Sequence, residues 1–330
     1  MFATGIPPMA LAFFGAVSVF ITIPSAVAVF SWLATLWYGR PWYPAAMKFM
    51  LGFIVLFVIG GVSGVMTAAV PFDFQLTDTY FVVAHLHYVL LGINVFPVIG
   101  GVHYWFPKMT GRMMDERLGK WSFWVMFVGF NVAFFPMHVT GLLGMPRRVY
   151  TYPSGYGWDG LNLLSSAGSL LLAVGILLFL VHVVRSRRHG AIAGDNPWDA
   201  ATLEWSVPSP PPPYNFKVIP RVESRVPLWA ARLGEPSPAL DTGLRLDHGR
   251  ETTGSRALDA APDAILKMPE DSLAPLVLAL GTGALFVALL LHSRPGVAAA
   301  AALVLGATLF WLWPRRELAQ TASFDAEERP

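Results

Sequence analysis

The stretch Asp78-Thr-Tyr-Phe-Val-Val-Ala-His85-Leu-His87-Tyr88 leads into an apolar run, Thr79–Phe106, that holds two neighbouring imidazoles and no charged residue. An uncharged apolar run of about 20 residues or more can cross a bilayer as a helix. An ionisable side chain within such a helix is costly and usually marks function. The stretch therefore predicts both a membrane-spanning fold and the place of its chemistry.

The composition agrees with a membrane environment. Of the 330 residues, 55% are hydrophobic and 13% are charged, and the mean hydropathy is +0.53. The charged share is about half of the roughly 25% that is usual in soluble proteins. The net charge of +2 comes without a basic patch, so nucleic acid is not an expected partner. The absence of cysteine excludes disulfides, thiolate zinc sites and iron–sulfur clusters.

Long uncharged apolar runs predict an all-α membrane protein with seven transmembrane helices. The runs are Met9–Tyr38, Phe49–Pro71, Thr79–Phe106, Trp121–Met145, Leu161–Val184, Leu273–Ser293 and Gly296–Trp313. The first run lacks the basic start and the cleavage site of a secretory signal, so we expect a retained helix.

The basic residues of the short loops set the expected orientation, because Lys and Arg favour the cytoplasmic side. One side receives Arg40, Lys48, Lys108, Arg112, Arg117, Lys120, Arg185, Arg187, Arg188, Arg315 and Arg316, and the other receives Arg147, Arg148 and Arg294. The N-terminus is therefore expected outside and the C-terminus in the cytoplasm. The adjacent pair Arg147 and Arg148 is an exception to this rule.

The chain is expected to have three parts. Residues 1–188 form a five-helix membrane portion, and residues 272–330 form a C-terminal transmembrane hairpin. Between them, residues 189–271 are polar and include the run Pro210–Pro213, which is typical of an extended cytoplasmic linker without its own core.

The spacing of the two histidines limits what they can bind. At about 100° per residue, His85 and His87 are turned about 200° apart, so they cannot share one metal but can serve different neighbours. Neutral imidazole is a good axial ligand for haem iron. The alternative is two buried histidines that bond to neighbouring helices, as we would expect of a lone intramembrane histidine. Among the others, His103 is expected at the membrane interface, His138 bonded within the bundle and His182 at a helix end.

The arginine pair in Gly144-Met145-Pro146-Arg147-Arg148 places two permanent cations on the outer side. A guanidinium group suits bidentate recognition of carboxylates. Haem propionates that point outward would meet the pair there. The alternative is a pair of solvated loop residues.

Three motifs together resemble subunit I of the haem–copper cytochrome oxidases: Phe81-Val-Val-Ala-His85-Leu-His87-Tyr88, Gly144-Met-Pro-Arg147-Arg148 and Phe30-Ser-Trp-Leu-Ala-Thr35. The pieces Thr202-Leu-Glu-Trp205 and Pro211-Pro-Pro-Tyr214 resemble the tail of the same subunit. The match extends to about Phe216 and implies that the first five helices correspond to the last five of the family's twelve core helices. The remainder resembles the extra C-terminal hairpin of bacterial forms.

The resemblance implies an oxidoreductase, a terminal cytochrome c oxidase of a bacterial inner membrane. Such an enzyme reduces oxygen to water and couples this reaction to electron transport and proton translocation in aerobic respiration. His85 would ligate the high-spin haem of the oxygen site as the catalytic residue, and His87 would ligate the low-spin haem, both haems being expected to be A-type. Leu86 would pack between the two porphyrins.

The resemblance also implies an outer polar layer above the haems. Arg147 and Arg148 would hold haem propionates, and Asp73 would belong to this layer. Asp78 is expected to ligate a magnesium ion there, because this hard cation prefers oxygen ligands.

Three departures from the family pattern matter. The three copper histidines and the second axial ligand of the low-spin haem would precede Met1, so the chain is expected to be the C-terminal part of a longer subunit and incomplete on its own. Ala28 stands where the family has a proton-conducting lysine, which leaves proton pumping open. Thr77 stands where many members have a histidine, which removes one ligand of the magnesium ion.

The expected partners are the N-terminal half of subunit I, oxidase subunits II and III, membrane lipid, and cytochrome c or quinol as electron donor. The sequence does not separate these two donors. The alternative function is a non-catalytic membrane transporter or oxidase-assembly partner that keeps the helices without the chemistry.

Overall fold

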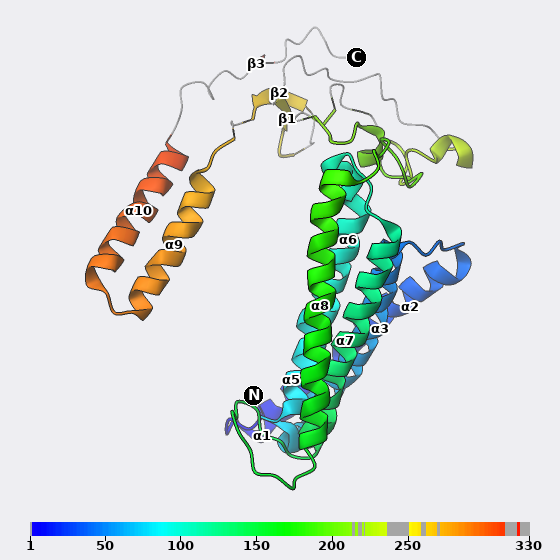
Figure 1. Cartoon of the computed structure of the whole chain (residues 1–330). Coiled ribbons are helices and arrows are strands. Elements are labelled where there is room, and N and C mark those ends of the chain that lie inside the picture. Colours follow the sequence, from blue (N-terminus) through cyan, green and yellow to red (C-terminus); the bar gives the residue numbers. More distant parts are fainter. Residues whose placement is uncertain are drawn as a thin grey trace. The chain divides into compact units, whose positions relative to one another are not determined.

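The computed structural model describes residues 2–212, 215–216, 220, 222–235, 251–258, 262–268, 271–313 and 322–323. The chain divides into two compact units, Met1–Trp198 and Asp199–Pro330. The first unit contains α1 (Pro8–Phe20), α2 (Thr22–Tyr38), α3 (Ala45–Ala68), α4 (Val70–Leu76), α5 (Tyr80–His87), the π-helical turn η1 (Tyr88–Gly92), α6 (Ile93–Thr110), α7 (Glu116–Leu142) and α8 (Asp159–His189) (Figure 1). The second unit contains the 3-10 turns η2 (Leu203–Ser206) and η3 (Ala230–Leu233), β1 (Glu251–Ser255), β2 (Pro262–Lys267), α9 (Ala274–Leu290), α10 (Arg294–Leu312) and β3 (Ala322–Ser323).

The prediction of a membrane protein whose spans are α-helices is confirmed. Six spans within the described residues are long and apolar enough to cross a membrane: Pro8–Tyr38, Ala45–Ala68, Tyr80–Thr110, Glu116–Leu142, Asp159–His189 and Arg294–Leu312. The seventh predicted span corresponds to α9, which is apolar but has only 17 residues. At about 1.5 Å per residue this helix falls short of the roughly 30 Å hydrocarbon core, so the count of seven is not confirmed.

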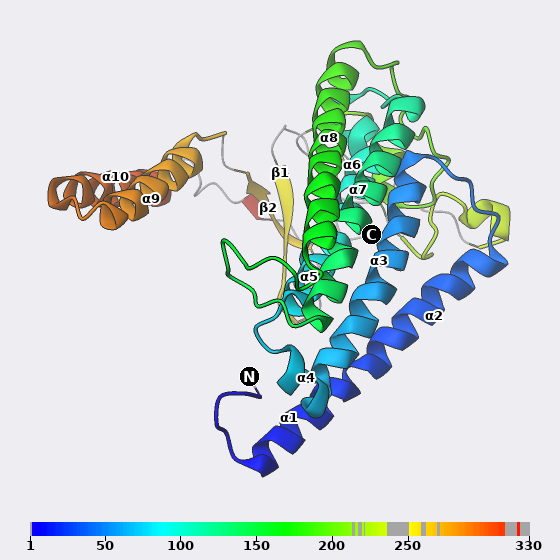
Figure 2. The ribbon, with the colours of Figure 1, turned by 60° about the horizontal axis from the view of Figure 1, so that its bottom comes forward.

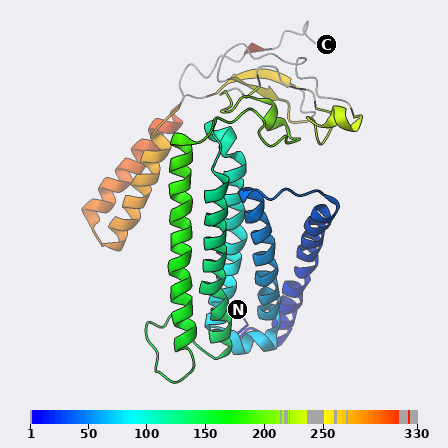
Figure 3. The same cartoon turned by 45° about the vertical axis from the view of Figure 1, so that its right-hand side comes forward.

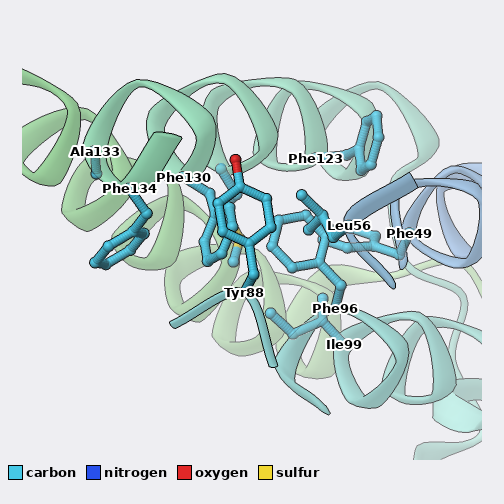
Figure 4. Packing of buried hydrophobic residues seen from close by; sticks show 10 residues of the cluster. Phe49, Leu56, Tyr88, Phe96, Ile99, Phe123, Phe130, Ala133 and Phe134 are labelled. Carbon is cyan, nitrogen blue, oxygen red and sulfur yellow. The ribbon is translucent and has the colours of Figure 1, made fainter. Parts of the chain in front are cut away.

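Helices α3, α6, α7 and α8 run roughly parallel and carry the core of the first unit (Figure 3). The core is an aromatic cluster in which Phe49, Tyr88, Phe96 and Phe130 are almost completely buried (Figure 4). The ring of Tyr88 meets that of Phe130 edge to face at 5.0 Å between centroids. Aromatic side chains bury large areas and prefer such edge contacts, so the cluster fixes the relative positions of four helices.

Helices α7 and α8 approach each other closely through glycines. A Cβ atom at Gly129 would lie 2.5 Å from the backbone nitrogen of Leu172. One at Gly168 would lie 2.3 Å from the backbone nitrogen of Ala133. Small residues at a membrane helix interface let the backbones touch, so α7 packs directly on α8 while it also contacts α5.

Helices α1 and α2 form one long span that is interrupted at Ile21. They meet α3 beside α4, and α2 then diverges from α3 toward Tyr38 (Figure 2). Large apolar side chains on α2 remain exposed, among them Phe30 and Trp37. The outer face of this span is therefore suited to lipid or to another membrane segment.

The long run that contains the histidine pair is not one regular helix. The π-helical turn η1 separates α5 from α6 directly after His87. The side-chain amide of Asn94 donates to the backbone oxygen of Val89, five residues earlier, at 3.1 Å. A π turn widens the helix by one residue and often marks a functional site.

The described part of the predicted linker, residues 189–271, includes the turns η2 and η3 and the strands β1 and β2. Strands β1, β2 and β3 form an antiparallel sheet in that order, with Thr253 opposite Ile265.

Near the start of the second unit, hydrogen bonds from the Arg232 guanidinium lower the pKa of the exposed Asp199 carboxyl. Helices α9 and α10 form a hairpin in which Gly281 faces Leu303 and Val304.

Candidate functional site

The imidazole of His85 is held from behind by α3. Its Nδ1 lies 3.1 Å from the backbone oxygen of Gly60 and 3.0 Å from Oγ of Ser63. Room for the ring comes from Gly64, where a Cβ atom would lie 3.0 Å from the Cε1 atom of His85. The ring is therefore anchored to a neighbouring helix through Nδ1.

His85 lines a cavity of about 760 Å³ between α5, α3 and the α1–α2 span. Most of the lining side chains are apolar, including Val29, Phe30, Phe57 and Val58. The polar side chains in the lining are Ser18, Thr22, Ser25, Thr67, Asp73 and His85. Among the polar lining residues, His85 carries the only side chain that can offer a nitrogen ligand to a metal.

His87 faces the other way, toward α7. Its Nδ1 lies 2.7 Å from the backbone oxygen of Val83, one turn earlier on the same helix. Its ring stacks on Phe134 with 4.2 Å between centroids and 15° between planes. Leu86, between the two histidines, is 40% exposed. The predicted divergence of the two imidazoles is confirmed.

The position of α5 depends on the end of α7 and the loop that follows it. The backbone nitrogen of Tyr80 donates to the oxygen of Met145 at 2.9 Å, and Thr79 pairs with Pro146 in a short β-bridge. Gly141 touches the start of α5, because a Cβ atom there would lie 2.0 Å from the backbone nitrogen of Phe81. The arginine motif and the histidine motif are therefore neighbours in space.

Arg147 binds Asp78 at this junction. Its Nε donates to Oδ1 of Asp78 at 2.6 Å, a second guanidinium nitrogen pairs with the same oxygen, and its backbone nitrogen donates to the oxygen of Asp78 at 2.8 Å. Asp78 and Arg148 both have positive φ angles, 62° and 68°. Asp78, expected to ligate magnesium, and Arg147, expected to bind a haem propionate, are therefore bonded to each other. The next residue, Arg148, is exposed.

The other predicted acidic residue, Asp73, lies on α4 and lines the cavity with His85. Its carboxylate accepts a hydrogen bond of 2.9 Å from the hydroxyl of Thr77. Within the described part of the chain, no three His, Asp or Glu side chains come together as a metal site. Magnesium at Asp78 therefore stays a prediction.

Two of the remaining histidines are more buried than the sequence indicated. His103 was expected at the interface, but it is only 4% exposed and lies between Phe49 and Phe179. His182, expected at a helix end, is fully buried 5.4 Å from the ring of His103. Both positions near helix ends agree with the sequence, but the burial was not predicted, and it arises because Phe49 of α3 and Phe179 of α8 pack against the ring of His103.

The donor set of the site fits the haems that the sequence implies. In a metal-bound histidine the second ring nitrogen usually donates to a carbonyl, which fixes the tautomer and directs the other nitrogen at the metal. Both His85 and His87 have a backbone oxygen at Nδ1, so Nε2 is the nitrogen that each could offer to a metal. These features define the class: a multi-pass helical membrane protein that can offer one axial imidazole on each side of a helix.

The comparisons with known proteins identify the family. Residues 1–171 match the family model described as cytochrome c and quinol oxidase polypeptide I. Cytochrome c oxidase subunit 1 of Bacillus subtilis (strain 168) is 43% identical over 290 residues, which cover 87% of this chain and 43% of that protein. The subunit of the same name from Thermostichus vulcanus is 46% identical over 222 residues, which cover 67% and 40%. The chain belongs to the cytochrome c and quinol oxidase polypeptide I family.

A solved structure supports the same fold. A cryo-EM structure of a heme-copper terminal oxidase dimer matches with a TM-score of 0.52 and 19% identity, over 58% of this chain and 39% of that chain. The chain spans less than half the length of these curated relatives. The protein is therefore a multi-pass membrane protein of the haem–copper oxidase subunit I family that matches part of its relatives' length.

Proposed function

We propose that this chain provides the haem-binding second half of a terminal oxidase subunit I that reduces oxygen to water. The observation that carries the proposal is the divergent pair His85 and His87, each with Nδ1 held at a backbone oxygen. In this proposal His85 is the axial ligand of the high-spin haem and His87 is an axial ligand of the low-spin haem. When bound, the haems supply the electron transfer and oxygen chemistry.

The residues around His85 suit an oxygen site. The cavity that His85 lines is mostly apolar, which would suit a porphyrin ring better than bulk water. Leu86 lies between His85 and His87 in the sequence and is partly exposed, so its side chain would pack between the edges of the two porphyrins. Burial in an apolar pocket with a few placed polar groups is the usual form of a cofactor site.

The outer end of α5 would hold the acidic edges of the haems. Arg147 lies within hydrogen-bonding distance of Asp78, while Arg148 is exposed beside it. Charge-assisted bonds from guanidinium to carboxylate are strong, so both arginines could turn toward propionates. Asp73 would belong to the same polar layer, and Asp78 would offer an oxygen to magnesium.

The rest of the active enzyme is proposed to come from outside this chain. Copper, its histidines and the second axial ligand of the low-spin haem would come from the other half of subunit I. Subunits II and III and an electron donor, cytochrome c or quinol, would complete the enzyme in a bacterial inner membrane, with the N-terminus of this chain outside. Because Ala28 leaves α2 without a charged side chain, the protons would enter through another part of the enzyme.

The experiment is to purify the oxidase from membranes of cells in which this chain carries an affinity tag. We expect low-spin and high-spin haem bands in the reduced-minus-oxidised spectrum, together with oxygen uptake. A purified complex without haem would overturn the proposal. It would favour instead a non-catalytic membrane transporter or assembly partner.

Replacing Arg147 with alanine is expected to lower the midpoint potential of the nearer haem, because a nearby cation stabilises the more negative reduced form. The fold should change little, since exposed ion pairs contribute about 0.2–1 kcal/mol. A spectroelectrochemical titration measures the potential. Arg187→Ala, in the last turn of α8, is the control for removal of an arginine. Unchanged potentials in Arg147→Ala would show that this guanidinium lies away from the haems.

A further inference from the structure

Ser63 is a buried hydroxyl that the proposed ligand set does not use. It lies on α3, one turn after Gly60, and is 4% exposed. Its Oγ donates to the backbone oxygen of Gly60 at 3.0 Å and lies 3.0 Å from Nδ1 of His85. The hydroxyl, the carbonyl and the imidazole nitrogen thus form a closed triangle behind the ring.

Which atoms donate and which accept in this triangle depends on which ring nitrogen of His85 binds the metal. If Nε2 of His85 binds a metal, the ring hydrogen must be on Nδ1. This N–H then donates toward two acceptors, the backbone oxygen of Gly60 at 3.1 Å and Oγ of Ser63. The hydroxyl can accept from the imidazole because its own hydrogen is used on Gly60.

We propose that Ser63 is a positioning residue, which fixes the tautomer and the ring orientation of His85 so that Nε2 is directed at the high-spin haem. This inference rests on the proposed function and concerns the same site. A second acceptor on Nδ1–H raises the basicity of the imidazole and strengthens its bond to a metal.

The two histidines differ in this respect. Among the described residues, His87 has a single acceptor, the oxygen of Val83 on its own helix, so its ring moves with α5. His85 is tied to α3 by two acceptors, so its ring keeps its place relative to the cavity. The ligand of the oxygen site is therefore held more firmly than the ligand of the electron-transfer haem.

The test compares three variants of the purified oxidase. Ser63→Ala removes the second acceptor and favours the helix by propensity, so α3 should persist. Ser63→Thr keeps the hydroxyl. Thr67→Val removes a hydroxyl that lines the same cavity but bonds to the backbone oxygen of Gly64.

The readout is the iron–imidazole stretching band of the reduced high-spin haem in resonance Raman spectra. We expect this band to move to lower frequency and to broaden in Ser63→Ala, and to keep its wild-type position in Ser63→Thr and Thr67→Val. Turnover in Ser63→Ala should fall about tenfold, the lower end for loss of an outer-shell partner. A wild-type band in Ser63→Ala would overturn the inference.

A measurement on haem-free protein gives an independent check. In detergent-solubilised chain labelled with ¹⁵N histidine, His85 should populate the Nδ1–H tautomer, and Ser63→Ala should shift the population toward the other tautomer. Equal populations in both proteins would contradict the positioning role. If the wild-type enzyme has no iron–imidazole band, or if the band survives in His85→Ala, the proposed function itself fails, whatever Ser63 does.

Discussion

Replacing His87 with alanine is expected to remove the low-spin haem band while the high-spin band remains, and replacing His85 should have the reverse effect. The physical reason is the divergence of the two rings. His85 contacts Ser63 on α3, and His87 stacks on Phe134 of α7. Neither ring can take the place of the other without turning α5 by about 200°. Reduced-minus-oxidised spectra of the purified oxidase measure both bands, and oxygen uptake should be lost in both variants.

The matched control is His189→Ala, an exposed histidine in the last turn of α8. This variant should keep both bands and the oxygen uptake. If both bands were retained in His85→Ala and in His87→Ala, neither imidazole would be an axial ligand. If each variant lost both bands, α5 would hold the haems only as a unit.

The divergence of the histidines could be predicted because it depends on local helix geometry alone. Two residues at i and i+2 face different sides of any α-helix, whatever surrounds it. The apolar runs likewise predicted the membrane spans, since length and lack of charge decide whether a helix can cross a bilayer. The turn η1, directly after His87, does not disturb this result because it begins beyond the pair.

The parts of the site that depend on distant contacts could not be predicted in the same way. Asp78 and Arg147 are 69 residues apart, and only the packing of α5 against α7 makes them partners. The cavity needs the divergence of α2 from α3, which no short motif determines. In the sequence, Ser63 is one small residue among others in Gly60-Gly-Val-Ser63-Gly64. Its proposed role follows only from its contact with Nδ1 of His85 in the folded chain.

The burial of His103 and His182 is a further feature that the sequence could not predict. Both lie near helix ends in the sequence, where polar side chains usually reach the interface. Here the ring of His103 packs on Phe49 at 5.3 Å and on Phe179 at 5.6 Å, so the pair is closed off from solvent. Position along a helix predicts depth in the membrane, but it does not predict which face the neighbouring helices cover.

The contact between Gly141 and Phe81 helps to set the position of α5, which carries the proposed haem ligands His85 and His87, so Gly141→Ala is expected to have a large effect. The added Cβ would lie 2.0 Å from the backbone nitrogen of Phe81 and 2.6 Å from its Cβ. Normal contact distances exceed these values by more than 1 Å, so α5 must move away from α7. Misplacement by about 1 Å can reduce catalysis about 100-fold, and overpacking costs about 1–3 kcal/mol of stability.

We expect Gly141→Ala to shift both haem bands together, unlike the selective losses in His85→Ala and His87→Ala, because the contact moves α5 as a whole. Oxygen uptake and the thermal stability of the purified oxidase measure the two consequences. Gly160→Ala, at a glycine of α8 with open space around its Cβ position, is the matched control and should leave both unchanged. Wild-type spectra in Gly141→Ala would mean that α5 takes its position from α3 and the loop at Met145, without help from the α7 contact.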